Sequence, residues 1–177
     1  MKKVERELCN IMKKLEGNLI GIGLSEPKLL DKIEENNRIT ECTLLNDQTG
    51  ELNKEKGRGI KKLNIRKLRK KFKKKRIDTI ICATEEIALY AKTFVKDSIY
   101  ITKGTIYFYG DDLDILENIQ EKYKRYQVST KQEKYGQAYL YIVEVKDAKN
   151  HRIKEIGYYI KDTVMNGIDY LSDYLVH

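Results

Sequence analysis

The residues best suited to chemistry lie early in the chain, where Gly21, Gly23 and Ser25 follow a short apolar run and precede Glu26 and Pro27. Glycine permits positive φ angles and lets a backbone approach a ligand closely. A serine followed by Glu-Pro is typical of a helix start. The pattern therefore predicts either a cofactor-binding loop beside a helix N-terminus or an ordinary strand-to-helix turn.

Cys82 and Thr84 form a second candidate group, because they come where another apolar run ends. In an open α/β sheet the ligand crevice lies at the carboxyl ends of the strands, so we expect both residues at its rim. A cysteine at a strand end is more often a small buried hydrophobe than a nucleophile. Neither His151 nor His177 is placed to activate it, and the sequence identifies no catalytic residue.

The basic residues are concentrated in one segment. Residues 54–76 hold 14 Lys and Arg against one acidic residue, a net charge of +13, so the rest of this +8 chain sums to −5. Within residues 66–76, Leu68 and Phe72 can dock a helix on a sheet. The other nine residues are cationic: Arg66, Lys67, Arg69, Lys70, Lys71, Lys73, Lys74, Lys75 and Arg76.

Two interpretations of this basic run are open. It can be the solvated face of a crossover helix. Clustered like charges repel one another and lower stability, however, and a bound polyanion would relieve the repulsion. Phosphate contacts of this kind carry little sequence information. We expect RNA or DNA to be the partner.

Composition excludes several other classes of protein. The three cysteines are far apart and form no CxxC pair, which argues against a zinc site or a disulfide framework and favours a reducing cytoplasm. No run of 18 apolar residues is present, so we expect no membrane span, and the amino end does not resemble a secretory signal. We expect a cytoplasmic protein that binds no metal.

The elements that must position these residues follow from apolar periodicity. It predicts helices at residues 1–16, 28–36, 66–76, 85–95, 111–124 and from about 152, and strands at 19–22, 41–45, 62–65, 77–82, 105–109, 126–133 and 137–145. A hairpin through Lys103 and Gly104 is an alternative for the fifth strand.

Strands that alternate with helices indicate an α/β fold with a mainly parallel sheet and helices on both faces. The closing hairpin places an antiparallel strand near one edge. We expect this Rossmann-like domain to cover residues 1–150, followed by a C-terminal helical extension at 151–177. The apolar stripe of that extension can cover a sheet face or form the seam of a homodimer.

The order of elements resembles the Rossmann-like methyltransferases that depend on S-adenosylmethionine (SAM), over roughly residues 1–145. "NLIGIGLSEP" (18–27) is similar to the family's first strand and glycine loop, "CTLLND" (42–47) to its second strand, and "KGTIYFYG" (103–110) to its fifth. The resemblance implies SAM as the cofactor, with Asn46 and Asp47 holding the ribose. The same two residues also fit a plain turn. The implied cofactor-binding residues are Gly21, Gly23, Ser25, Asn46, Asp47, Cys82 and Thr84.

The chain also departs from that family. Leu19 or Gly21 stands where the family has an acid ahead of the glycine loop, and residues 82–86 (CATEE) are not the Asn-Pro-Pro-aromatic stretch of amino-methylating enzymes. Three functions remain open. The first is a SAM-dependent methyltransferase acting on nucleic acid, and the second is a catalytically inactive methyltransferase-like domain that binds nucleic acid or a protein partner. The third is a nucleotide-binding regulator that uses a dinucleotide in the same crevice. We also expect Gly23→Val to abolish SAM binding while leaving the fold intact.

Overall fold

A computed structural model describes residues 3–24, 26–45, 68–72, 76–111 and 116–146 of the 177-residue chain. Its sheet has six strands: β1 (Gly17–Ile22), β2 (Ile39–Leu45), β3 (Ile77–Ala83), β4 (Thr102–Gly110), β5 (Val128–Tyr135) and β6 (Ala138–Val145). The strand predicted at 62–65, the helix predicted from about 152 and the domain expected at 151–177 lie outside the described residues.

The strand order is β2-β1-β3-β4-β6-β5. β1 pairs in parallel with β2 and with β3, and β3 pairs in parallel with β4. β6 lies between β4 and β5 and is antiparallel to both. The predicted α/β fold, with a mainly parallel sheet and an antiparallel hairpin strand, is confirmed. A hairpin through Lys103 is wrong, because β4 follows a helix and pairs in parallel with β3.

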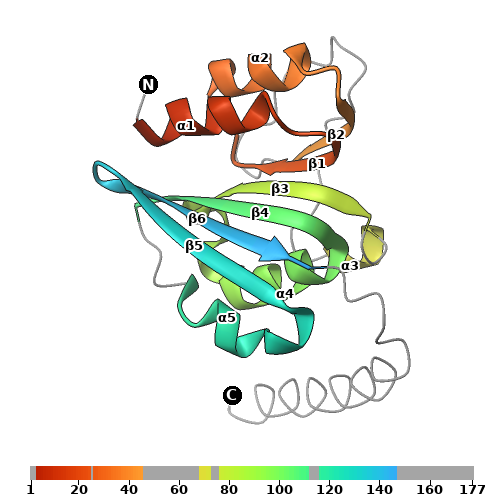
Figure 1. Cartoon of the computed structure of the whole chain (residues 1–177), viewed down its shortest axis with the longest axis vertical. Helices are drawn as coiled ribbons and strands as arrows, with labels where there is room; N and C mark the ends of the chain where they lie inside the picture. The colour runs from red at the N-terminus through yellow and green to blue at the C-terminus, as the bar shows by residue number, and fades with distance from the viewer. Residues whose placement is uncertain (1–2, 25, 46–67, 73–75, 112–115, 147–177) are drawn as a thin grey trace. The chain divides into compact units, whose positions relative to one another are not determined.

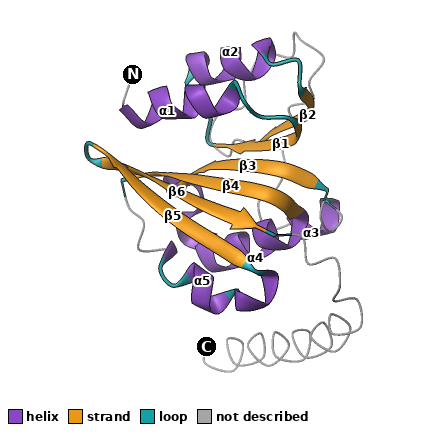
Figure 2. Ribbon diagram, in the orientation of Figure 1, coloured by secondary structure: helices purple, strands orange, loops and turns teal. Residues whose placement is uncertain are grey.

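Helices cover both faces of this sheet (Figure 1). On one face lie α1 (Lys3–Met12) and α2 (Pro27–Glu35), and on the other lie α3 (Leu68–Lys71), α4 (Ala91–Ile101) and α5 (Ile119–Lys122). Figure 2 shows the same arrangement coloured by secondary structure. Within the described part of the chain, no helix is both long and apolar enough to cross a membrane.

Each face has its own apolar core because successive strand side chains point to opposite sides. In β1, Leu19 packs with the α1 and α2 side chains, whereas Ile20 and Ile22 pack with those of α4. α1 meets the sheet through Val4, Leu8 and Met12, whose spacing of four residues puts them on one helical face.

Two predicted helices contain 3-10 segments in the structure. The predicted 85–95 helix is a 3-10 helix, η3 (Thr84–Tyr90), followed by α4, which continues to Ile101. The break falls at Tyr90, whose φ of −133° and ψ of 15° are not helical. The predicted 111–124 helix is described only as α5 and a second 3-10 helix, η5 (Lys124–Tyr126), which Tyr123 separates.

The amino ends of the strands converge on Asp78 in β3. Its carboxylate accepts the backbone N–H of Asn18 at 2.9 Å and pairs with the Lys103 ammonium at 3.0 Å. A Cβ on Gly17 would meet the Asp78 carboxylate, and a Cβ on Gly104 would meet the Asp78 carbonyl oxygen. Packing and charge at the amino-terminal edge of the sheet therefore explain the Lys-Gly pair that follows Thr102 in β4.

Candidate functional site

The carboxyl ends of β1, β2, β3 and β4 meet at Gly23, directly after β1. Gly23 has a φ of +68°, and its N–H donates to the carbonyl oxygen of Leu45 at the end of β2, at 3.2 Å. The Tyr109 hydroxyl, near the end of β4, donates to the Gly23 carbonyl oxygen at 3.1 Å. The glycine loop is thus tied to strands on both sides of β1.

Gly23 is also in close contact with the segment that follows β3. A Cβ at this position would lie 2.9 Å from the Cβ of Ala83 and would overlap the Cγ methylene of Glu86. The absence of a side chain therefore lets η3 approach the loop, and it places the Glu86 side chain against Gly23. This contact joins residues 63 positions apart in the sequence.

Gly21, the other glycine predicted for the cofactor loop, lies in a closely packed position. It is buried, and a Cβ there would lie 2.5 Å from Leu24 Cδ1 and 2.8 Å from Leu44 Cδ2. Leu19 is 2% exposed in the core beside α1. Neither Leu19 nor Gly21 can supply the acidic side chain that the family resemblance leads one to look for here. Ser25, Asn46 and Asp47 lie outside the described residues.

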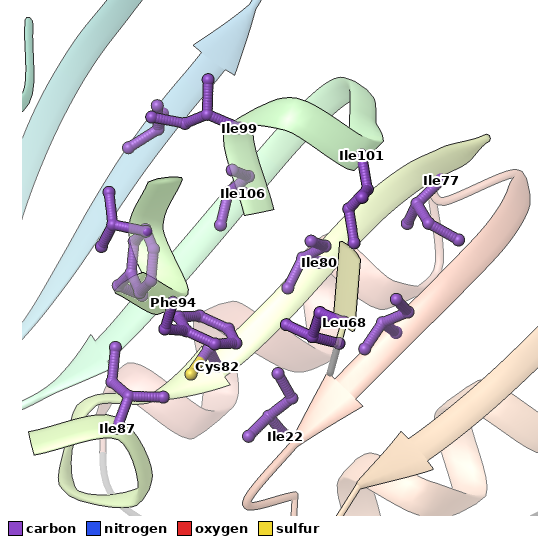
Figure 3. Packing of buried hydrophobic residues seen from close by; sticks show 14 of the residues in the cluster. Ile22, Leu68, Ile77, Ile80, Cys82, Ile87, Phe94, Ile99, Ile101 and Ile106 are labelled. Atoms are coloured by element: carbon purple, nitrogen blue, oxygen red, sulfur yellow. The ribbon is translucent and has the colours of Figure 1, made fainter. Parts of the chain in front are cut away.

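The side chains of Cys82 and Thr84 are both buried. Figure 3 shows the Cys82 sulfur beside Phe94, in the core that faces α4. Burial raises the pKa of this thiol well above its usual value, and the nearby Glu86 and Glu85 charges raise it further, so it stays protonated. The Thr84 hydroxyl lies against Gly110. A ligand at this edge would therefore meet only backbone atoms of these two residues.

Two site residues that the sequence analysis missed are Tyr109 and Glu86. Burial raises the pKa of Tyr109, and Glu85, Cys82, Glu5 and Glu86 raise it further, so its hydroxyl remains a donor at neutral pH. The sequence held partial signals: Tyr109 near the end of a predicted strand, and the Glu pair after residue 84. Neither signal indicates a contact with Gly23.

The polar groups described at this edge include the carboxylates of Glu85 and Glu86, the phenol of Tyr109 and the backbone carbonyl of Gly23. Glu85 reaches the end of β4, with its Oε2 3.3 Å from where a Cβ on Gly110 would stand. This set of negatively charged and electron-rich groups fits a positively charged ligand group. Within the described ranges, no group of three or more Cys, His, Asp or Glu side chains is arranged to hold a metal ion.

Little of the basic run falls within the described residues. Arg69 lies in α3, and its guanidinium stands 4.0 Å from the centroid of the Tyr100 ring. The backbone and guanidinium of Arg69 also interact with Asp97, a buried residue of α4. Arg76 is exposed just before β3, and Lys70 and Lys71 belong to α3. Arg66, Lys67, Lys73, Lys74 and Lys75 lie outside the described residues.

No protein-family model matches the chain, and no curated protein matches it. Solved structures do. A precorrin-6y C5,15-methyltransferase from Geobacter metallireducens superimposes with a TM-score of 0.57 at 9% identity, covering 80% of this chain and 87% of that one. A SAM-dependent methyltransferase from Clostridium acetobutylicum gives 0.51 at 11%, covering 80% and 89%. The chain has the fold of the Rossmann-like SAM-dependent methyltransferases.

A third structure of this methyltransferase fold contains a cofactor. It is Streptococcus pneumoniae Sp1610, proposed to be a tRNA (m1A22) methyltransferase and solved with SAM. It gives a TM-score of 0.54 at 15% identity, covering 84% of this chain and 75% of that one. At these identities the likeness concerns the methyltransferase fold alone.

Proposed function

We propose that this chain binds SAM at the carboxyl ends of β1 and β3 and acts as a methyltransferase on nucleic acid. The observation that carries the proposal is the position of Gly23. β2 pairs on one side of β1 and β3 on the other, so the strand order reverses beside this loop, and an open α/β sheet binds its ligand at such a reversal.

The residues at this edge fit the methionine end of SAM. Its ammonium and sulfonium are cationic, and Glu86 supplies negative charge beside Gly23, whereas Glu85 carries a second negative charge near Gly110. Tyr109 fixes the loop through the Gly23 carbonyl oxygen. Asn46 and Asp47 would hold the ribose, a role that rests on the sequence alone. Cys82 and Thr84 would contribute backbone atoms, because their side chains are buried.

SAM supplies a methyl group already activated by its sulfonium, so the chain's own task is to position the acceptor and exclude water. Nucleic acid is the proposed acceptor for two reasons. The run at 54–76 carries a net charge of +13, and the pneumococcal protein of the same fold is proposed to act on tRNA.

A catalytically inactive domain that binds nucleic acid or a protein partner is the second candidate. The burial of Cys82 and Thr84 at the end of β3 favours it. Neither side chain can act as a nucleophile or base from there. In that case SAM binding, if retained, would only stabilise the domain.

Two measurements test these proposals. SAM and S-adenosylhomocysteine should raise the thermal unfolding midpoint, whereas NAD and ATP at equal concentration should not, because only a ligand of the native state stabilises it. Transfer of a labelled methyl group from SAM to tRNA, ribosomal RNA or DNA then separates the enzyme from the inactive domain. No midpoint shift with SAM would overturn the proposed function.

A further inference from the structure

We infer that Glu86 is the residue that binds the ammonium group of the ligand at the glycine loop. This assignment rests on the proposed function and adds a specific carboxylate to it. Glu86 lies on η3, after β3, and not on β1. Its position therefore follows from the packing of η3 on the loop.

The side chain of Glu86 is in contact with Gly23. A Cβ on Gly23 would overlap the Glu86 Cγ methylene and would lie 3.3 Å from the Glu86 Cδ, the carbon of the carboxylate. The carboxylate is therefore held at the loop backbone. Glu86 is half-buried, and partial removal from water strengthens its interaction with a cation.

The Gly23 carbonyl oxygen is a second possible acceptor for a ligand ammonium. The Gly23 carbonyl oxygen already accepts the Tyr109 hydroxyl, and a carbonyl oxygen can accept a second hydrogen bond. The Glu86 side chain contacts the same residue, so we infer that its carboxylate and this carbonyl oxygen together accept N–H bonds from one donor group. A primary ammonium carries three donors and no acceptor, so it fits this pair, whereas a thioether or a phosphate does not.

Glu85 provides a matched control. It is adjacent in sequence and carries the same charge, but it is exposed and its carboxylate lies by Gly110 instead of Gly23. Glu85→Gln and Glu86→Gln therefore remove the same charge from the same edge. A difference in ligand affinity between the two variants therefore reports a direct contact of Glu86 with the ligand, and not the general effect of removing one negative charge from this edge.

The experiment is calorimetric titration of the full chain and both variants with three probes. SAM has the ammonium and the sulfonium, S-adenosylhomocysteine has the ammonium alone, and 5′-methylthioadenosine has neither. Because a hydrogen bond between charged groups is lost, Glu86→Gln should weaken SAM and S-adenosylhomocysteine about 10- to 100-fold and leave methylthioadenosine within about 2-fold. Glu85→Gln should leave S-adenosylhomocysteine within about 3-fold.

Each other outcome overturns a stated claim. If the unmodified chain binds neither SAM nor S-adenosylhomocysteine, the proposed function fails and this assignment fails with it. If the unmodified chain binds SAM and Glu86→Gln weakens no probe, or weakens all three equally, only the assignment fails. Should Glu86→Gln not fold, equal binding of methylthioadenosine and S-adenosylhomocysteine by the unmodified chain still refutes it.

Discussion

Replacing Gly23 with alanine tests the geometry at the centre of the candidate site. Two costs add at this position. The φ of +68° is a conformation that alanine adopts at a cost of about 1–2 kcal/mol. The new Cβ would also overlap Glu86 Cγ and lie 2.9 Å from the Ala83 Cβ. Overpacking of that kind costs about 1–3 kcal/mol.

Gly136 is the matched control. Its φ is +73°, close to that of Gly23, but a Cβ there would meet nothing within 4 Å. Gly136→Ala should therefore carry the backbone cost alone. Gly23→Ala should lower the free energy of unfolding by about 2–5 kcal/mol in total, and by about 1–3 kcal/mol more than Gly136→Ala.

Urea unfolding followed by circular dichroism measures this difference. With a slope of about 1–3 kcal/mol per molar urea, an extra 2 kcal/mol moves the midpoint by about 1 M. Equal midpoints for the two variants would refute the contact between Gly23 and η3. The same overlap with Glu86 and Ala83 applies to Gly23→Val, so the expectation that this variant keeps its fold is wrong. A larger side chain at this position would destabilise the fold, so loss of SAM binding in that variant would not isolate a cofactor contact.

Three further predictions concern other parts of the chain. Gly104→Ala should lower the unfolding free energy by about 1–3 kcal/mol, because its Cβ would overlap the Asp78 carbonyl oxygen; an unchanged urea midpoint would contradict this. Burial raises the pKa of Asp97 above its usual 3.8 against the opposing charge of Arg69. The folded state then holds the proton more tightly, so this stabilising contribution is complete below about pH 4 and is lost as pH rises through the raised pKa. As pH rises from about 4 through the raised pKa of Asp97, the unfolding free energy of Asp97→Asn should therefore increase relative to that of the unmodified chain, as measured by urea titration. A difference in unfolding free energy that stays constant from pH 3 to 7 would contradict this prediction. RNA or DNA binding should weaken with salt with a log–log slope of about −3 for about four phosphate contacts. Changing Lys70, Lys71, Lys74 and Lys75 to Glu should remove most of that slope; filter binding that is unaffected would show a solvated surface only.

Local patterns in the sequence were sufficient for most of the sheet. Strand side chains alternate with period two and helical ones recur at three and four, so β3 and α1 were predicted within a few residues of their observed bounds. The sequence pattern does not predict the helix boundaries where two helical segments adjoin. Ile87, Ala91 and Phe94 suit one continuous helix, yet the chain forms η3 and then α4.

Which face a side chain occupies was decided by the tertiary structure. The sequence predicts Cys82 at a crevice rim, and strand alternation in the observed register buries its side chain in the core with Phe94. The two loop glycines were equivalent in the sequence. In the structure Gly21 makes room for Leu24 and Leu44, whereas Gly23 makes room for Glu86.

The composition and order of the residues thus determined the α/β class, the alternation of elements and the location of the basic run, because these depend on local periodicity and charge. Only the tertiary structure brought Tyr109 and Glu86 to the loop at Gly23. Tyr109 lies 86 positions after Gly23 in the sequence, and Glu86 lies 63 positions after it. Such contacts arise when parallel strands align their carboxyl ends at one edge. The identity of the side chains that meet there is set by register and by the packing of η3, and no local pattern encodes either.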